Sequence, residues 1–219
     1  MENDLQPIQT TPQPQLQTSA PKQHRGEGFW AALSTISILL IAPVVAIILT
    51  AFVFQSYQVD GPSMQTTLQN NDRLIVWKLP RTWARITGHS YVPQRGDIVI
   101  FNESNLSAFG QAGSKQLIKR VIGLPGERVE IKNNKLVVYN STHPEGFVPD
   151  DTMPYGNVIG DTEPEQDRTS WTLGSNEIFV SGDNRSDSLD SRAFNAVPLN
   201  DVIGKLAVRI LPLGEAKRF

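Results

Sequence analysis

The hydrophobic residues of this chain form one long continuous run, followed by a series of short runs. The long run extends from Phe29 to Phe54, 26 residues without a charged side chain. Because a helix of about 20 residues crosses the roughly 30 Å hydrocarbon core of a bilayer, the run predicts a transmembrane anchor helix over 29–54. Pro43 is a candidate kink within it. A cleaved signal peptide fits less well, because its apolar region is usually about 7–15 residues long.

The residues that flank this run predict its surroundings. Residues 1–28 are rich in Gln, Pro and Thr and offer little apolar surface to bury, so we expect a disordered tail. Lys22 and Arg25 precede the run, whereas the first basic residue after it is Arg73. Basic residues collect on the cytoplasmic side of a membrane. We therefore expect a cytoplasmic tail and an extracytoplasmic domain over 55–219, on the periplasmic or lumenal side of a cell membrane.

Beyond the anchor, short runs rich in Val and Ile are bounded by Gly, Pro, Asn and Asp, a pattern typical of strands. Two polar, turn-rich stretches, 102–115 and 140–170, predict loops or a small surface insertion. No long amphipathic helix competes with the strands, so we expect a mainly β domain, a barrel or sandwich of short antiparallel strands. The predicted strands are 74–77, 97–101, 116–122, 128–131, 135–139, 178–180 and 202–210.

Composition and charge exclude several functional classes. The 219 residues carry a formal net charge of −2, which gives no indication of nucleic-acid binding. There is no cysteine, which excludes disulfides, thiolate catalysis and cysteine-ligated metals. The chain also lacks the H-E-x-x-H motif of metalloproteases and the G-x-S-x-G motif of α/β-hydrolases. His24, His89 and His143 lie in tail or loop sequence and are interpreted as solvated. We expect no metal and no cofactor.

A serine shortly after the anchor is the candidate nucleophile. Ser63 follows Gly61 and Pro62, which constrain the backbone and can expose a hydroxyl beside a backbone N–H. On composition alone, an ordinary loop that links the anchor to the domain explains this segment better. The serine becomes a catalytic candidate only if the chain also supplies a group that activates it.

Lys119 is the candidate base. In a strand over 116–122 it shares one face with Leu117 and Val121, which allows it to be buried. An exposed lysine has a pKa of about 10.4 and is almost wholly protonated near neutral pH. Burial lowers that pKa, and a shift of roughly 2–3 units would supply a general base. Arg120 points to the other face and cannot usefully deprotonate, so we expect it on a solvated face.

The segment 181–192 is polar and contains spaced acidic residues. A calcium-loop interpretation fails, because Arg185 and Phe194 occupy ligand positions that require Asp or Asn and Glu. The alternative is a loop held by internal hydrogen bonds and ion pairs, with Asp190 and Arg192 the candidate pair.

Taken together, these segments resemble the type I signal peptidases, also called leader peptidases, a family of membrane-anchored serine proteases with a Ser/Lys dyad. The resemblance covers most of residues 57–210, behind a single N-terminal anchor. Four blocks in the family's order are more specific than any one of them. The blocks are Gly-Pro-Ser-Met at 61–64, Gly-Asp-Ile-Val-Ile-Phe at 96–101, Lys-Arg-Val-Ile-Gly-Leu-Pro-Gly-Glu at 119–127 and Gly-Asp-Asn-Arg…Asp-Ser-Arg at 182–192.

The resemblance implies a role for each matching residue. Ser63 would attack the scissile carbonyl, Lys119 would take its proton, and Ser188 would hydrogen-bond and orient the lysine amine. The backbone N–H of Ser63 would be an oxyanion donor, with Gly61 and Met64 in the oxyanion-hole and substrate-binding group. Structural residues near the site would be Asp183, Asn184, Arg185, Asp190 and Arg192.

Two positions depart from part of the family. Gly61 stands where some members carry a serine whose hydroxyl assists the oxyanion hole, so here the hole would depend more on backbone donors. Thr66 replaces a common proline, which removes no catalytic group.

The implied activity is removal of N-terminal signal peptides from secretory preproteins, cut after small residues such as Ala at positions −3 and −1. Ser63 is nine residues beyond Phe54, a reach of at most about 30 Å, so the nucleophile would lie close to the lipid bilayer. Two alternatives are a self-cleaving Ser/Lys protein of the repressor type, which would need a DNA-binding domain, and a membrane-tethered, non-catalytic binding module on the same β scaffold.

Overall fold

An apolar helix leads into the folded part of the chain. The computed structural model describes residues 27–104, 113–153, 158–165 and 167–219. Helix α1 (Glu27–Ile48) continues into a π-helical turn, η1 (Leu49–Val53). The 19 residues Thr35–Val53 have a mean hydropathy of 2.9, so by length and composition this helix can cross a membrane. The chain separates into two units, residues 1–44 and 45–219, and all described strands belong to the second.

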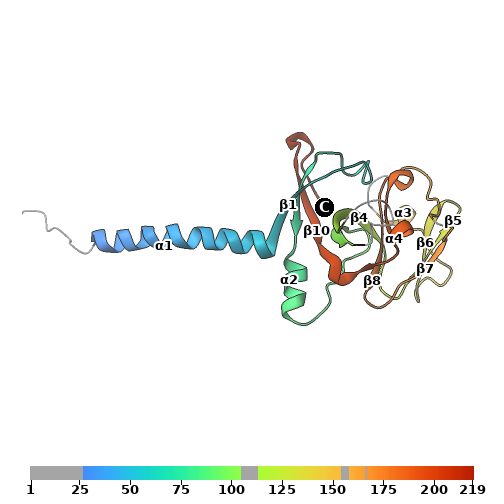
Figure 1. Ribbon diagram of the computed structural model, residues 1–219, viewed down its shortest axis with the longest axis horizontal. Coiled ribbons are helices and arrows are strands. Elements are labelled where there is room, and N and C mark those ends of the chain that lie inside the picture. The colour runs from blue at the N-terminus through green and yellow to red at the C-terminus, as the bar shows by residue number, and fades with distance from the viewer. Residues whose placement is uncertain (1–26, 105–112, 154–157, 166) are drawn as a thin grey trace, which may run out of the picture. The chain divides into compact units, whose positions relative to one another are not determined.

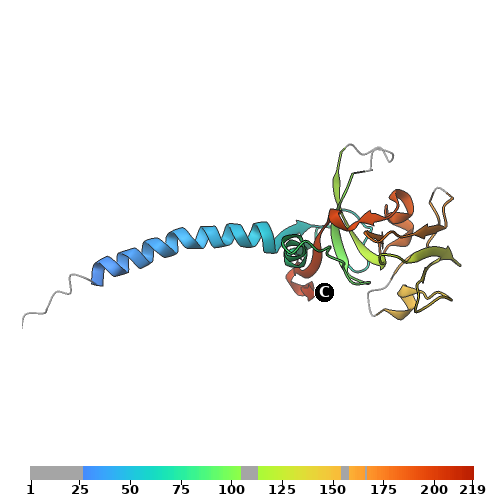
Figure 2. The same ribbon diagram turned by 90° about the horizontal axis from the view of Figure 1, so that it is seen from below.

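The second unit is built on a large antiparallel sheet, shown in Figures 1 and 2. This arrangement confirms the predicted mainly β class, and the predicted strands are present with ends that differ by at most two residues. In hydrogen-bonded order the strands are β1 (Phe54–Gln58), β2 (Arg73–Trp77), β10 (Val202–Leu211), β3 (Ile98–Glu103), β4 (Lys115–Gly123), β8 (Glu177–Ser181) and β9 (Val197–Pro198), with β11 (Lys217–Arg218) paired to β10.

A smaller sheet lies at the end of this unit opposite β1 (Figure 1). Its order is β6 (Lys135–Tyr139), β5 (Arg128–Lys132) and β7 (Ser170–Thr172). Asn133 and Asn134 form the tight turn between β5 and β6 with positive φ of 50° and 60°, which asparagine tolerates. The two sheets share a core, because Ile122 and Phe179 of the large sheet pack with Val129 and Trp171 of the small one.

The loop between β1 and β2 is fixed to the large sheet by its apolar side chains. Met64 and Leu68 are fully buried and pack with Leu74, Ile98 and Leu206. Burying a side chain of this size contributes about 1.5–3 kcal/mol. The burial of these two side chains therefore holds the backbone around Ser63 against the large sheet.

Short helices and turns connect the strands. They are α2 (Leu79–Ile86), α3 (Pro149–Thr152), α4 (Ser191–Phe194), η3 (Arg185–Asp187), η4 (Leu199–Asp201) and η5 (Leu213–Glu215). The predicted loop 102–115 contributes residues to β3 and β4, and its centre, 105–112, is outside the described residues. The described part of the predicted loop 140–170 contains α3 and one partner of each of two isolated bridges, Phe147 with Val138 and Ile159 with Asn184. Residues 154–157 and 166 of this loop are outside the described residues, and Ser170 begins β7.

Several described elements were not predicted, among them β1, α2 and the short strands β7, β9 and β11. Strand β1 begins at Phe54, which we had assigned to the anchor, so the helical part ends at Val53. Helix α2 was not predicted, because eight residues give little periodic signal.

Candidate active site

Ser63 and Lys119 meet in the folded chain. Ser63 lies in the loop after β1, and Lys119 is the fifth residue of β4. The Nζ atom of Lys119 is 2.7 Å from Ser63 Oγ and 3.0 Å from the carbonyl oxygen of Ile118. Two groups that are 56 residues apart in sequence are thus within direct hydrogen-bond distance.

The environment of Lys119 favours its neutral form. The residue is 3% exposed. Burial lowers the pKa of its amine from 10.5 to about 8, although the carboxylates of Asp190 and Asp183 act in the opposite direction. A lysine with this pKa is partly neutral near pH 7 to 8 and can accept a proton from a hydroxyl.

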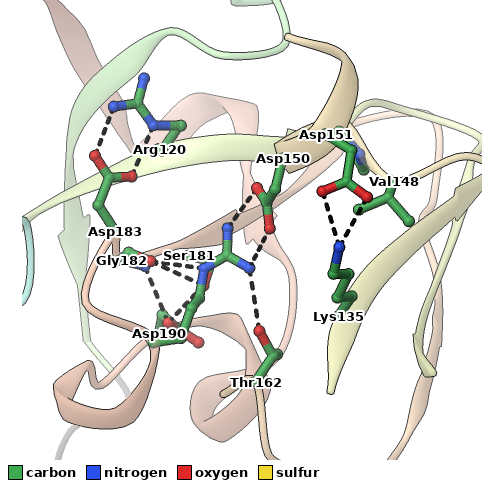
Figure 3. A network of polar contacts seen from close by, with 12 residues as sticks. Arg120, Lys135, Val148, Asp150, Asp151, Thr162, Ser181, Gly182, Asp183 and Asp190 are labelled. Carbon is green, nitrogen blue, oxygen red and sulfur yellow. Dashed lines mark hydrogen bonds and ion pairs between the residues drawn. The ribbon is translucent and has the colours of Figure 1, made fainter. Parts of the chain in front are cut away.

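Arg120 corrects one sequence-based expectation. We expected it on a solvated face, but it is 3% exposed and forms a buried ion pair. Its Nε and Nη2 atoms donate to the two carboxylate oxygens of Asp183 at 2.7 and 2.6 Å (Figure 3). Thr67, from the same loop as Ser63, donates to Asp183 at 2.5 Å. Asp183 therefore ties the serine loop to the strand that carries Lys119.

Two neighbours of Asp183 hold the serine loop directly. The backbone N–H of Asn184 donates to the Ser63 carbonyl at 3.0 Å, and its side-chain amide donates to the Pro62 carbonyl at 3.4 Å. Gly182 permits this close approach, because a Cβ atom there would lie 2.4 Å from the Ser63 carbonyl oxygen and 2.3 Å from Ser188 Oγ.

Asp190 and Arg192 form a second buried ion pair, 2.9 Å between Nε and Oδ1. Burial opposes ionisation of Asp190, but hydrogen bonds from Arg192 and from the Gly182 N–H hold the pKa of its carboxyl below the ordinary value. Ser181 Oγ also donates to this carboxylate at 2.9 Å. This buried ion pair and its hydrogen bonds therefore hold the backbone around Gly182 in place.

Arg185 extends the same network to α3. Its side chain is buried, donates to the Gly182 carbonyl at 2.9 Å, and pairs with Asp150 at 2.7 Å. Thr162 accepts a further hydrogen bond from it at 3.2 Å. Sequence reasoning missed Asp150 and Thr162, which lie in a stretch expected to be loop and carry no local signal of pairing with Arg185.

The expected partner of Ser188 is not found. Its side chain is buried, and the Lys119 amine donates instead to Ser63 Oγ and to the Ile118 carbonyl oxygen. The hydrogen bond from Ser188 to the Lys119 amine is therefore absent from this arrangement.

A groove of about 240 Å³ opens onto Ser63 and Lys119. One side is the end of β1 and the loop after it, and another is the first half of β4, residues 115–119. The Gly61 N–H already donates to the Asn70 side chain at 3.0 Å. The Ser63 N–H, in contrast, donates to no other group in the described part of the chain, and the Met64 side chain is buried beneath the loop. Within the described ranges, no cluster of three or more His, Cys, Asp or Glu residues could hold a metal ion.

A serine hydroxyl hydrogen-bonded to a buried lysine is the arrangement of Ser/Lys hydrolases. Comparison of the sequence with known protein families agrees with this class. The model of the family described as signal peptidase, peptidase S26, matches residues 32–211, so the chain belongs to that family.

Individual relatives cover most of the chain. Signal peptidase I of Bacillus caldolyticus is 34% identical over 178 residues, covering 78% of this chain and 87% of the relative. The probable signal peptidase I-1 of Synechocystis sp. is 32% identical over 178 residues and covers 81% of each. Signal peptidase I of Leptolyngbya laminosa is 28% identical over 204 residues, covering 93% of this chain and 91% of the relative.

Proposed function

We propose that this chain is a membrane-bound serine endopeptidase that removes signal peptides from secretory preproteins, with Ser63 as nucleophile and Lys119 as general base. Membership of the signal peptidase family supports the reaction. The observation that carries the two residue roles is the 2.7 Å separation between a serine hydroxyl and a buried amine whose pKa is lowered to about 8.

The mechanism follows from this geometry. The neutral Lys119 amine takes the proton of Ser63 as Oγ attacks the carbonyl carbon of the scissile bond. The Ser63 N–H faces the oxyanion that forms, and one such donor is typically worth about 10²–10³ in rate. The Lys119 ammonium then protonates the departing amine of the mature protein, which leaves the signal peptide as an ester on Ser63. Lys119 next deprotonates water, which hydrolyses that ester.

The groove suits an extended substrate. The 115–119 half of β4 pairs with β3 on one side, whereas β8 pairs with β4 only from Arg120 onward. An extended chain laid against these residues can form main-chain hydrogen bonds with a strand edge, and side-chain specificity then comes from the pockets between. A small groove favours small side chains, consistent with Ala at −3 and −1 before the cut.

The structural residues hold this pair in place. We assign Asp183, Asn184, Arg185, Asp190 and Arg192 a positioning role, because they form the network that joins the serine loop to β4 and to the loop after β8. We propose residues 1–28 as a cytoplasmic tail, 29–54 as the membrane anchor (its helix ends at Val53), and 55–219 as the extracytoplasmic catalytic domain.

Two alanine variants test the dyad. Ser63→Ala and Lys119→Ala, purified in detergent, should each lower the rate of cleavage of a preprotein with an Ala-x-Ala site by at least about 1,000-fold. The first variant removes the proposed nucleophile and the second removes the proposed general base. Ser141→Ala and Lys135→Ala, at exposed positions, serve as matched controls and should retain activity. Full activity in either dyad variant would refute the assignment.

A further inference from the structure

A second groove, largely apolar, lies within the second unit beside the catalytic groove. Its volume is about 870 Å³. One wall is the end of the apolar helix, with Ile48 and Phe52, and the other is α2, with Leu79, Trp83 and Ile86.

Helix α2 turns its apolar face outward. Leu79, Trp83 and Ile86 are spaced four and then three residues apart, so they share one face of the helix. They are 39%, 65% and 73% exposed. A surface helix normally packs this face against its own core. The apolar face of α2 is therefore left available to an apolar partner.

The groove is held in shape by hydrogen bonds. Lys78, at the start of α2, donates to the carbonyl oxygens of Thr50 and Ala51 at 3.1 and 2.7 Å. Thr82 donates to the Phe52 carbonyl at 3.0 Å. These bonds join α2 to the last turn of the apolar helix, so the two walls form one preorganised surface.

The apolar groove is continuous with the catalytic groove. Tyr57 and Gln116 line both. Strand β1 runs between the two, from Phe54 to Gln58, and five strand residues span about 15 Å. An extended substrate segment of about five residues before the scissile bond would therefore reach from Ser63 toward the apolar groove.

We propose that this groove receives the end of the substrate's apolar segment nearest the scissile bond. The inference rests on the proposed function, since only a signal peptide places such a segment just before the cut. The concave shape and the shared wall with the catalytic groove favour a substrate segment over a lipid surface, which would meet an apolar patch from outside.

The experiment compares two substrates in each variant of the full chain. One substrate is a preprotein with its whole apolar segment, and the other is a short peptide of the residues around the same scissile bond. The ratio of kcat/KM for the preprotein to kcat/KM for the peptide should fall about tenfold in Ile86→Ser, mainly through KM, since the variant removes apolar contact area. Leu213→Ser, an equally exposed aliphatic residue outside the groove (78% against 73% exposed), should leave the ratio unchanged.

A photo-crosslinker at position 86, in a Ser63→Ala background that leaves the substrate uncut, should label the apolar segment of the preprotein. An unchanged ratio in Ile86→Ser, an equal fall in Leu213→Ser, or labelling of lipid or of a second copy alone would overturn the proposal. A different result would contradict the proposed function itself, namely that Ser63→Ala still cleaves the short peptide.

Discussion

The proposed role of Lys119 as general base predicts how the activity of this protein depends on pH. Only the neutral amine accepts the proton of Ser63, and its pKa is lowered to about 8. Because the neutral fraction increases with pH up to the pKa, kcat/KM should rise about tenfold per unit below pH 8 and level off above it. A pH series with a preprotein substrate measures this.

A flat profile between about pH 5 and 9 would contradict that assignment. Lys119→Arg is the matched control, and it should be inactive throughout the range because a guanidinium does not deprotonate in proteins.

Gly182 should be intolerant of any side chain. An added Cβ would lie 2.4 Å from the Ser63 carbonyl oxygen, a backbone atom that cannot move without shifting the nucleophile. Gly182→Ala should therefore lower kcat by at least about tenfold and cost about 1–3 kcal/mol of stability. Steady-state kinetics and thermal unfolding in detergent measure the two effects.

Gly174→Ala is the control for that variant, because its added Cβ would meet only the flexible end of the Glu177 side chain, at 3.2 Å. Wild-type kcat in Gly182→Ala would show that the serine loop does not depend on this close approach.

The sequence predicted one of two adjacent cations correctly and the other wrongly, for a physical reason. Lys119 is flanked on its own strand face by apolar residues, a local signal of burial. Arg120 was expected to be solvated because its partner, Asp183, is 63 residues further along the chain. Alternation within a strand says which residues share a face, but it does not say which distant loop covers that face.

At the level of elements, the contact between β4 and the loop after β8 depends on the buried Arg120–Asp183 pair. Asp183→Asn keeps the shape of the side chain but leaves a buried guanidinium without its counter-charge. Loss of one partner from a buried pair costs about 3–5 kcal/mol, so the unfolding temperature should drop by many degrees and activity should fall with it. Thermal unfolding in detergent provides the measurement.

The control is Asp151→Asn, which breaks an exposed ion pair with Lys135. The Lys135 and Asp151 side chains are 51% and 54% exposed, so the loss of this pair should cost under about 1 kcal/mol of stability. Equal effects of the two substitutions would show that the buried pair does not hold the loop.

Elements with a strong composition signal were predictable, and those without one were not. Strands rich in Val and Ile, such as β3 and β10, were located within two residues. Strand β1 has the sequence Phe-Gln-Ser-Tyr-Gln, with no β-branched residue, and directly follows an apolar helix. Its pairing with β2 comes from the tertiary structure, which local propensity does not encode.

At the scale of the whole molecule, the proposed orientation of the chain in the membrane can be tested. With the tail in the cytoplasm and residues 55–219 outside, protease added to intact spheroplasts should digest the catalytic domain and spare a tag at the N-terminus. Permeabilised spheroplasts, in which both sides are accessible, provide the control. Digestion of the tag with survival of the domain would reverse the proposed orientation.

The position of β1 at the end of the large sheet has a consequence for the solubility of this protein. Among the described strands β1 pairs only with β2, so its other edge presents unpaired backbone groups. Many proteins protect such an edge with charges or proline, and β1 has neither. The end of β1 lines the catalytic groove opposite the proposed substrate edge on β4, so a bound substrate would also cover part of β1. Without substrate, the exposed edge of β1 can template pairing between copies. Aggregation through β1 is thus the expected liability of preparing this domain at high concentration without substrate.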